Sequence, residues 1–275
     1  MAFESIWLAT DLGKEAIGPW AHALRICVAS STDLRVLHVR QGTVPDWTQL
    51  PSPRRLLTGW GFVPEDASLD DFAALGIHVR MQALEAEHPV GLLAAMIHVE
   101  EPDLLVLGTH RPHGVERLLE GSVGETLARR APGAALLVPD GARPFVVPDD
   151  GTLRLRKILV PAGEAGAQHG IDAALQLLDA LGVASAEIVL VYVGAAETAP
   201  LLRTPERDGV HWRYVRYADG PIVGRILETA TAEDVDLIAM ATHGRDSWWD
   251  GVWGSRTERV LRDAAVPVLA ATIPD

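Results

Sequence analysis

Two stretches, Asp103-Leu-Leu-Val-Leu-Gly-Thr-His110 and Asp236-Leu-Ile-Ala-Met-Ala-Thr-His243, decide how the whole sequence is interpreted. Each is a short apolar run that begins with Asp and ends in Thr-His. After the same number of residues each is followed by a Gly-Ser pair, Gly121-Ser122 in one case and Gly254-Ser255 in the other. Chance similarity between apolar runs would not preserve this spacing, so the chain contains an internal repeat.

The repeat extends outward from these two stretches in both directions. Apolar strand patterns alternate with helical patterns, which predicts βαβ units and a parallel sheet. The strands are nearly continuous apolar runs, which is typical of strands covered by helices on both faces. The expected strands are 5–11, 34–39, 77–83, 103–110 and 134–138, matched by 157–163, 188–193, 210–217, 236–243 and 266–270. The expected helices are 15–30, 90–100 and 123–130, matched by 167–181, 222–233 and 256–263.

A change in composition separates the two copies. Residues 140–152 are rich in Pro, Gly and Asp and are typical of a linker. We therefore expect one domain over 1–140, a linker over 141–153 and a second domain over 154–275. The second copy is shorter between its second and third strands. The corresponding stretch of the first copy, 41–76, is interrupted by prolines, and we expect loop plus short helix there.

Charge and composition exclude several functional classes. A formal net charge of -13 argues against a general nucleic-acid or anionic-membrane binder. No apolar run approaches the ~18 residues that a membrane helix needs, and the N-terminus lacks a signal-peptide pattern. The one cysteine, Cys27, cannot form an intramolecular disulfide and is expected to be a small buried apolar residue. These features fit a cytoplasmic protein.

The common phosphate-binding motifs are absent from the sequence. Gly13-Lys14 is followed by Glu15, so it is not a P-loop, and no GxGxxG occurs. In an open parallel sheet, ligands bind beyond the carboxyl ends of the strands at the switch point. Asp11 and Gly108-Thr109 end the first and fourth strands. Gly121-Ser122 opens the next helix, whose free N–H groups suit phosphate.

On these residues the sequence resembles the universal stress protein family in its tandem form, over nearly the whole chain. The resemblance implies an α/β fold of two doubly wound, Rossmann-like domains related by a pseudo-two-fold axis. Each would hold a five-stranded parallel sheet of order 3-2-1-4-5. Family members pair through their last strands, which a tandem chain can do internally. The nucleotide-binding members carry G-x2-G-x9-G-[ST] after strand four and an Asp at the end of strand one.

The resemblance also implies two nucleotide sites, and each departs from the motif. In the first copy Arg111 replaces the second glycine. In the second copy Ala241 replaces the first glycine and Gly163 replaces the aspartate. Arg111 would either fill the phosphate space or hold phosphate oxygens with its guanidinium. The first site comprises Asp11, Val39, Gly108, Thr109, Arg111, Gly121, Ser122 and Val123, and the second comprises Val193, Thr242, Gly244, Gly254 and Ser255.

The function expected from this reasoning is a stress-response regulator that binds ATP or AMP, mainly in the first domain, with Mg²⁺ if the ligand is ATP. A homodimer and an unidentified protein partner are also expected. The alternative is a module that binds a protein or an apolar ligand without nucleotide, suggested by the broken motifs and a tryptophan-rich loop. No catalytic set is identifiable, so slow ATP hydrolysis is the upper limit. His110 and His113 alone do not make a metal site.

Overall fold

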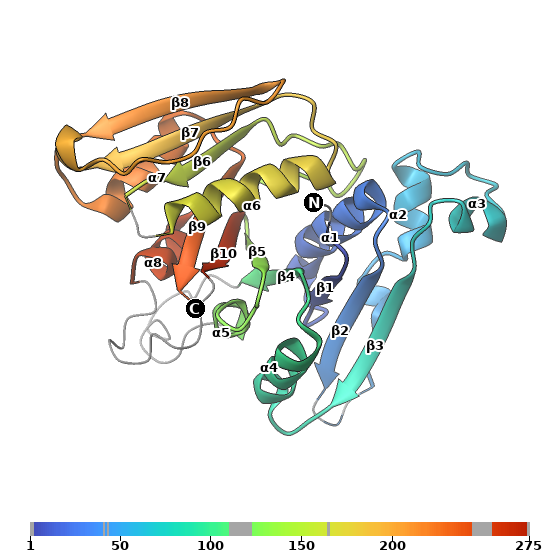
Figure 1. Cartoon of the computed structure of the whole chain (residues 1–275). Helices are drawn as coiled ribbons and strands as arrows, with labels where there is room; N and C mark the ends of the chain where they lie inside the picture. Colours follow the sequence, from blue (N-terminus) through green and yellow to red (C-terminus); the bar gives the residue numbers. More distant parts are fainter. Residues whose placement is uncertain are drawn as a thin grey trace.

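A computed structural model of the chain describes residues 3–40, 42, 44–109, 123–163, 166–243 and 255–273 (Figure 1). The first copy of the repeat contains β1 to β5 and the second contains β6 to β10. The elements of the first copy are β1 (Ile6–Ala9), η1 (Lys14–Ala16), α1 (Ile17–Ser30), β2 (Leu34–Arg40), η2 (Trp47–Gln49), α2 (Pro53–Gly59), α3 (Leu69–Ala73), β3 (Val79–Glu85), α4 (Pro89–Glu100), β4 (Leu104–Thr109), α5 (Val123–Ala128) and β5 (Ala134–Pro139). Those of the second copy are β6 (Lys157–Pro161), α6 (Ala167–Ala180), β7 (Ala186–Val193), η4 (Ala196–Thr198), β8 (Val210–Tyr217), α7 (Ile222–Ala232), β9 (Leu237–His243), α8 (Ser255–Asp263) and β10 (Val268–Ile273).

All ten strands belong to one sheet, in the order β3-β2-β1-β4-β5-β10-β9-β6-β7-β8. Every neighbouring pair is parallel except β5 with β10, which is antiparallel. Each copy therefore has the strand order 3-2-1-4-5, as the resemblance implied. The expected pairing through the last strands takes place within the chain.

The β5–β10 junction has local two-fold symmetry. Leu136 pairs with Leu269, and these residues occupy equivalent positions in the two copies. On either side of them, Leu137 pairs with Val268 and Ala135 pairs with Ala270. The two leucines are completely buried. The junction thus consists of one strand segment paired with its own repeat in antiparallel orientation.

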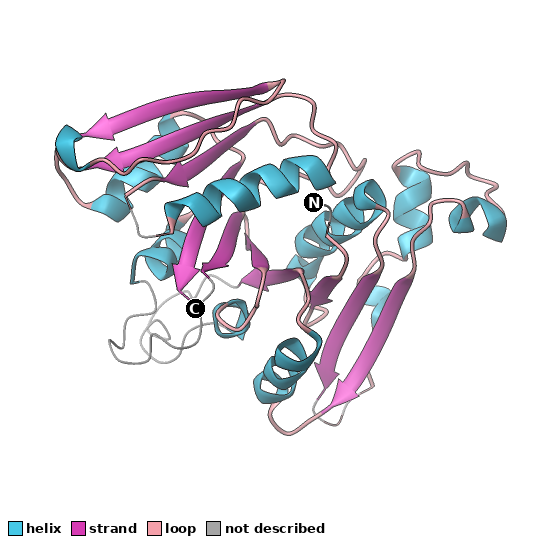
Figure 2. Ribbon diagram, in the orientation of Figure 1, coloured by secondary structure: helices cyan, strands magenta, loops and turns pink. Residues whose placement is uncertain are grey.

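Helices cover both faces of the sheet, as Figure 2 shows. On one face α1 and α6 lie next to each other and form a core with α2. On the other face α4, α5, α7 and α8 form a second core. The central strands are buried on both sides, which explains their continuous apolar sequences. Cys27, on α1, is buried as expected, and burial together with the charge of Asp33 raises the pKa of its thiol to about 12.

One aspartate in each copy fixes the start of the first strand. The Asp103 Oδ2 atom accepts the backbone N–H groups of Glu4 and Ser5 at 2.8 and 2.9 Å. Asp236 Oδ2 accepts those of Arg156 and Lys157 at the same two distances. Ser5 therefore corresponds to Lys157, and it follows that Asp11 corresponds to Gly163 and His22 to Ala174.

The expected element boundaries need small corrections. The third strand runs from Val79 to Glu85, two residues later at both ends than the predicted 77–83. The last strand runs from Val268 to Ile273 and not over 266–270. Residues 41–76 hold two short α-helices, α2 and α3, in addition to η2. Ser52 and Ser68 cap these two helices with their hydroxyl groups.

The segment predicted as a linker is packed against the first copy. Phe145 and Val146 are fully buried, and Val146 forms an antiparallel bridge with Leu153. The Trp60 indole N–H, from the end of α2, donates to the carbonyl of Pro148 at 2.9 Å. A Cβ at Gly151, which has φ +68°, would lie 2.5 Å from the Trp60 ring. The turn residues of this segment therefore form a folded loop that packs on α2.

His22 joins α1 to the same segment. Its Nδ1–H donates to the Gly18 carbonyl at 2.8 Å, which leaves Nε2 to accept the Val146 N–H at 3.3 Å. The Phe145 ring packs edge-on against the imidazole with 4.3 Å between ring centroids. Burial lowers the pKa of His22 to about 4, against a weaker opposing effect of the Gly18 hydrogen bond. The histidine is therefore neutral in the folded protein near pH 7.

Candidate functional site

The carboxyl ends of β1, β2 and β4 meet at one edge of the sheet. Ala9 pairs with Leu37 on one side and with Leu107 on the other, so the residues that follow lie together. This brings Asp11, Gly108 and Thr109 to the same edge, as predicted, together with Val39. The sheet order makes the place between β1 and β4 the switch point, where ligands bind in open parallel sheets.

Asp11 is an exposed carboxylate in a tight turn that leads into α1. Its Oδ1 atom accepts the Gly13 N–H at 2.8 Å. A Cβ at Gly13 would lie 3.1 Å from the other carboxylate oxygen, closer than nearly all real Cβ contacts. The Asp11–Gly13 hydrogen bond closes the turn, and glycine at position 13 leaves room for the carboxylate.

Gly108 has a packing role that the motif did not suggest. A Cβ at this position would lie 3.2 Å from the Pro19 ring, so glycine lets β4 approach α1 closely. Thr109, the next residue, is buried. Glycine at position 108 is therefore explained by helix–strand packing, whether or not a ligand approaches the same backbone.

Two aromatic side chains at this edge were missed by the sequence reasoning. The ring of His38, next to Val39, lies with Nδ1 2.9 Å from the Thr10 carbonyl oxygen, which accepts its proton. Trp47, from η2, packs edge-on against it with 6.1 Å between centroids. His38 could have been found from the sequence, because it is the residue before Val39 near the end of β2. Trp47 could not, because a long connection brings it there.

The equivalent edge of the second copy has a different arrangement. Gly163 replaces Asp11, and a Cβ there would lie 3.4 Å from the ring of Tyr192, the equivalent of His38. The hydroxyls of Tyr192 and Thr198 are 2.7 Å apart. Val193 ends β7 beside Tyr192, and Thr242 lies near the end of β9 with a buried hydroxyl that has no hydrogen-bond partner among the described residues. In the second copy, therefore, Gly163 replaces the Asp11 carboxylate and the Tyr192 ring replaces the His38 ring.

The remaining predicted site residues are only partly described. Arg111, Gly121, Ser122, Gly244 and Gly254 lie outside the described residues. The backbones of Val123 and Ser255 begin α5 and α8, which agrees with the expectation that the Gly-Ser pairs open a helix.

The described part of the chain offers neither a clustered metal site nor a membrane-spanning helix. No group of three or more His, Cys, Asp or Glu side chains in it is placed to hold a metal ion. No helix in these same ranges is long and apolar enough to cross a membrane.

The strand order and the internal repeat define a duplicated, doubly wound α/β protein. The model of the universal stress protein family matches residues 2–139 and 195–271. These two matches cover most of the chain, which therefore belongs to this family. The chain is also 25% identical, over 267 residues, to a universal stress protein of Mycobacterium tuberculosis, with 86% of each chain covered.

A solved structure that matches nearly the whole chain agrees with this assignment of the fold. A universal stress protein from Archaeoglobus fulgidus is similar with a TM-score of 0.62 and 17% identity, and 98% of each chain is covered. A universal stress protein solved in complex with cAMP matches 51% of this chain, with 21% identity and a TM-score of 0.38. The first of these structures is similar in fold over nearly the whole length of both chains.

Proposed function

We propose that this universal stress protein binds an adenine nucleotide, ATP or AMP, at the carboxyl edge of its first copy, and that binding regulates its action in a stress response. The observation that carries the proposal is the position of Asp11 at the switch point between β1 and β4. An exposed carboxylate at this place can accept hydrogen bonds from the hydroxyls of a ribose.

The proposal gives each end of the nucleotide its own contacts. Asp11 receives the ribose, and the edge formed by His38 and Val39 faces the base. Gly121 and Ser122 directly precede α5 and would offer backbone N–H groups and a hydroxyl to phosphate oxygens. If the ligand is ATP, Mg²⁺ would accompany its phosphates.

The contrast between the copies supports placing the nucleotide in the first. The second copy has lost the carboxylate, and the Tyr192 ring lies beside the position that it would occupy. A nucleoside at that edge would have to displace Tyr192 and its contact with Thr198. We therefore assign at most weak nucleotide binding to the second copy.

The test is a thermal shift with ATP and Mg²⁺, ATP with EDTA, AMP and cAMP on the whole protein. A ligand present at about 100 times its Kd adds about 2.7 kcal/mol to the stability of the folded state. We expect a rise in Tm of several degrees that is lost in Asp11→Ala and in Ser122→Ala. The matched control in the second copy is Thr242→Ala, which should keep the full rise.

Two outcomes would contradict the proposal in different ways. A rise that survives Asp11→Ala but disappears in Thr242→Ala would move the site to the second copy. The absence of any rise at millimolar nucleotide would remove nucleotide binding from the account. It would leave a module for a protein or an apolar ligand as the working function.

A further inference from the structure

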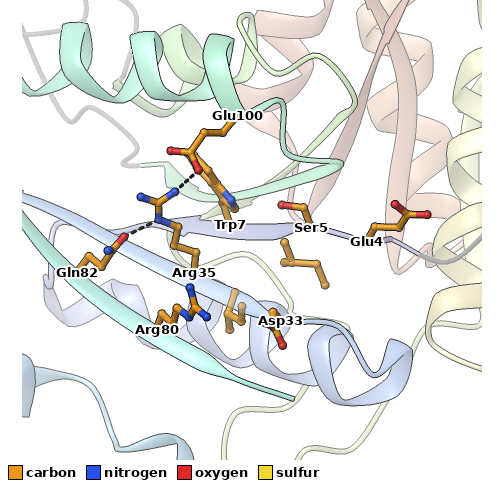
Figure 3. Close-up of a pocket in the computed structure, with 10 residues that line it drawn as sticks. Glu4, Ser5, Trp7, Asp33, Arg35, Arg80, Gln82 and Glu100 are labelled. Carbon is orange, nitrogen blue, oxygen red and sulfur yellow. Dashed lines mark hydrogen bonds and ion pairs between the residues drawn. The ribbon is translucent and has the colours of Figure 1, made fainter. Parts of the chain in front are cut away.

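A hollow of about 310 Å³ opens at the opposite, amino end of the first copy's strands (Figure 3). It lies between the beginnings of β1, β2 and β3 and the end of α4. Its lining includes six residues used in the argument below. They are Ser5, just before β1, Trp7 on β1, Asp33 and Arg35 at the start of β2, Arg80 on β3 and Glu100 at the end of α4. Its volume is at the lower end of the range for small-molecule sites.

One wall of the hollow is a row of side chains across three strands. Trp7 pairs with Arg35, and Arg35 pairs with Arg80, so all three side chains project from the same face of the sheet. The Arg35 guanidinium lies 4.7 Å from the centroid of the Trp7 ring. It also donates to Gln82 and pairs with Glu100. Arg35 is therefore held in place by its neighbours.

The second copy fills the equivalent corner with its own charges. There the row is Leu159, Val189 and Arg213. The Arg213 Nη1 atom lies 2.8 Å from Glu233 and 3.8 Å from Glu187. Lys157 Nζ lies 3.2 Å from Glu187 and 3.6 Å from Glu233, so four charged side chains form one closed network.

The first copy has the same positions but not the same network. Ser5 stands where the second copy has Lys157, and this exchange of a long side chain for a short one leaves space. Glu100, the equivalent of Glu233, is paired with Arg35. Asp33, the equivalent of Glu187, accepts from the backbone N–H and the ring of His78, both at 3.0 Å. In the described part of the chain, Arg80 has no ion pair with a carboxylate, unlike Arg213.

The hollow therefore presents one positive group, Arg80, and one negative group, Asp33, to a ligand. The Arg80 guanidinium offers a fork of N–H donors that matches a carboxylate. Asp33 lies close enough to Arg80 for the arginine's charge to contribute to lowering the aspartate pKa, although the His78 hydrogen bond contributes most. Asp33 is more than half exposed and keeps accepting capacity beyond His78. In Figure 3 Arg80 lies beside Arg35, and Asp33 lies further along, just before the start of β2.

We propose that this hollow is a binding site for a small zwitterion of the α-amino-acid class. Its carboxylate pairs with Arg80 and its ammonium group pairs with Asp33, while the Ser5 side of the hollow accommodates the side chain. The lining residues include carboxylates as well as two arginines, so a simple anion meets repulsion from Glu4 and Asp33. A dipolar molecule meets a partner for each of its charges. The site is independent of the nucleotide site at the other edge of the sheet.

The experiment screens the common amino acids at about 10 mM against the whole protein by ligand-observed saturation-transfer NMR, and measures the Kd of each positive by calorimetry. We expect at least one amino acid to bind. We expect acetate and methylamine, which carry only one charge each, to bind at least about tenfold more weakly. Arg80→Gln should weaken binding by about tenfold or more, and Ser5→Lys should abolish it by filling the corner as Lys157 does.

Two matched variants serve as controls. Arg213→Gln makes the same change in the second copy, and Asp11→Ala disturbs the other edge, so both should leave amino-acid binding unchanged. Circular dichroism and Tm would establish that each variant is folded. The proposal is overturned if no amino acid binds the wild-type protein, if acetate binds as well as the amino acid, or if folded Arg80→Gln and Ser5→Lys bind like the wild type.

Discussion

The two copies differ in what lies against their first helix. In the first copy α1 carries His22, which holds the 141–153 segment through Val146 and Phe145. In the second copy the equivalent residue of α6 is Ala174, a small buried side chain without a polar atom. The sheets of the two copies have the same strand order, so this difference shows that the duplicated frame tolerates a change of the side chain that meets a connecting segment.

The largest expected effect comes from the junction, where the copies are equivalent. Leu136 and Leu269 are both fully buried and pair with each other, so Leu136→Ala and Leu269→Ala should each cost about 2–5 kcal/mol of unfolding free energy. Because the positions are related by the local two-fold, the two costs should agree within about 1 kcal/mol. Denaturant unfolding of both variants measures them. A larger difference would mean that the symmetry of the strands does not extend to their packing.

The second prediction concerns His22 and has no counterpart in the second copy. Its pKa is about 4 in the folded protein, below the ordinary 6.5, so below pH 6.5 the unfolded chain binds a proton that the folded chain does not. The stability that neutral His22 contributes is complete above pH 6.5 and is lost as the pH falls toward 4. The expected loss over this interval is about 3 kcal/mol.

The measurement is the free energy of unfolding as a function of pH for the wild type and for His22→Gln. Other groups titrate in both proteins, so the informative quantity is the difference between the two curves. It should shrink steadily from pH 6.5 to pH 4. A difference that stays constant over this interval would show that His22 is not the source of the acid sensitivity.

The third prediction compares Asp103 with Asp236. Each carboxylate accepts two backbone N–H groups, so Asp103→Ala and Asp236→Ala should each cost about 2 kcal/mol. Asp236 should cost more, because Arg143 Nη2 also lies 3.5 Å from its other oxygen. Asp66→Ala, at an exposed site, is the control and should change stability little. Equal costs for the two aspartates would leave Arg143 without an energetic role at this site.

The smallest expected effect is at the carboxyl edge of the second copy. Tyr192→Phe removes the hydroxyl that meets Thr198 and should cost about 1 kcal/mol or less, because the contact is partly exposed. It should leave any nucleotide-dependent rise in Tm unchanged, because the nucleotide site is proposed to lie in the first copy. A lowered rise in this variant would show that the second edge takes part in nucleotide binding.

The sheet order could be predicted from the family resemblance, and the repeat and the place of three candidate site residues could be predicted from local sequence signals. The shared spacing from Thr-His to Gly-Ser aligned the copies and placed Asp11, Gly108 and Thr109 at one edge of the sheet. The packing of 141–153 could not be predicted, since Gly and Pro residues form exposed linkers and folded loops alike. Its burial depends on His22 and Trp60, which are distant in sequence. The role of Tyr192 beside Gly163 also depends on a cross-strand contact that composition does not reveal.

The β5–β10 junction has a consequence for assembly by strand addition. The junction pairs β5 with β10, so these two strands are not available to another chain. The outermost strands of the described sheet are β3 and β8, at opposite ends. Chains that joined β3 of one molecule to β8 of the next would form an open fibre and not a closed pair. Exposed charges lie along both edges, Arg80 and Glu85 on β3 and Arg213 on β8, and such charges are how natural sheets discourage aggregation. Fusing the two copies therefore leaves the protein with edges that favour solubility over polymerisation.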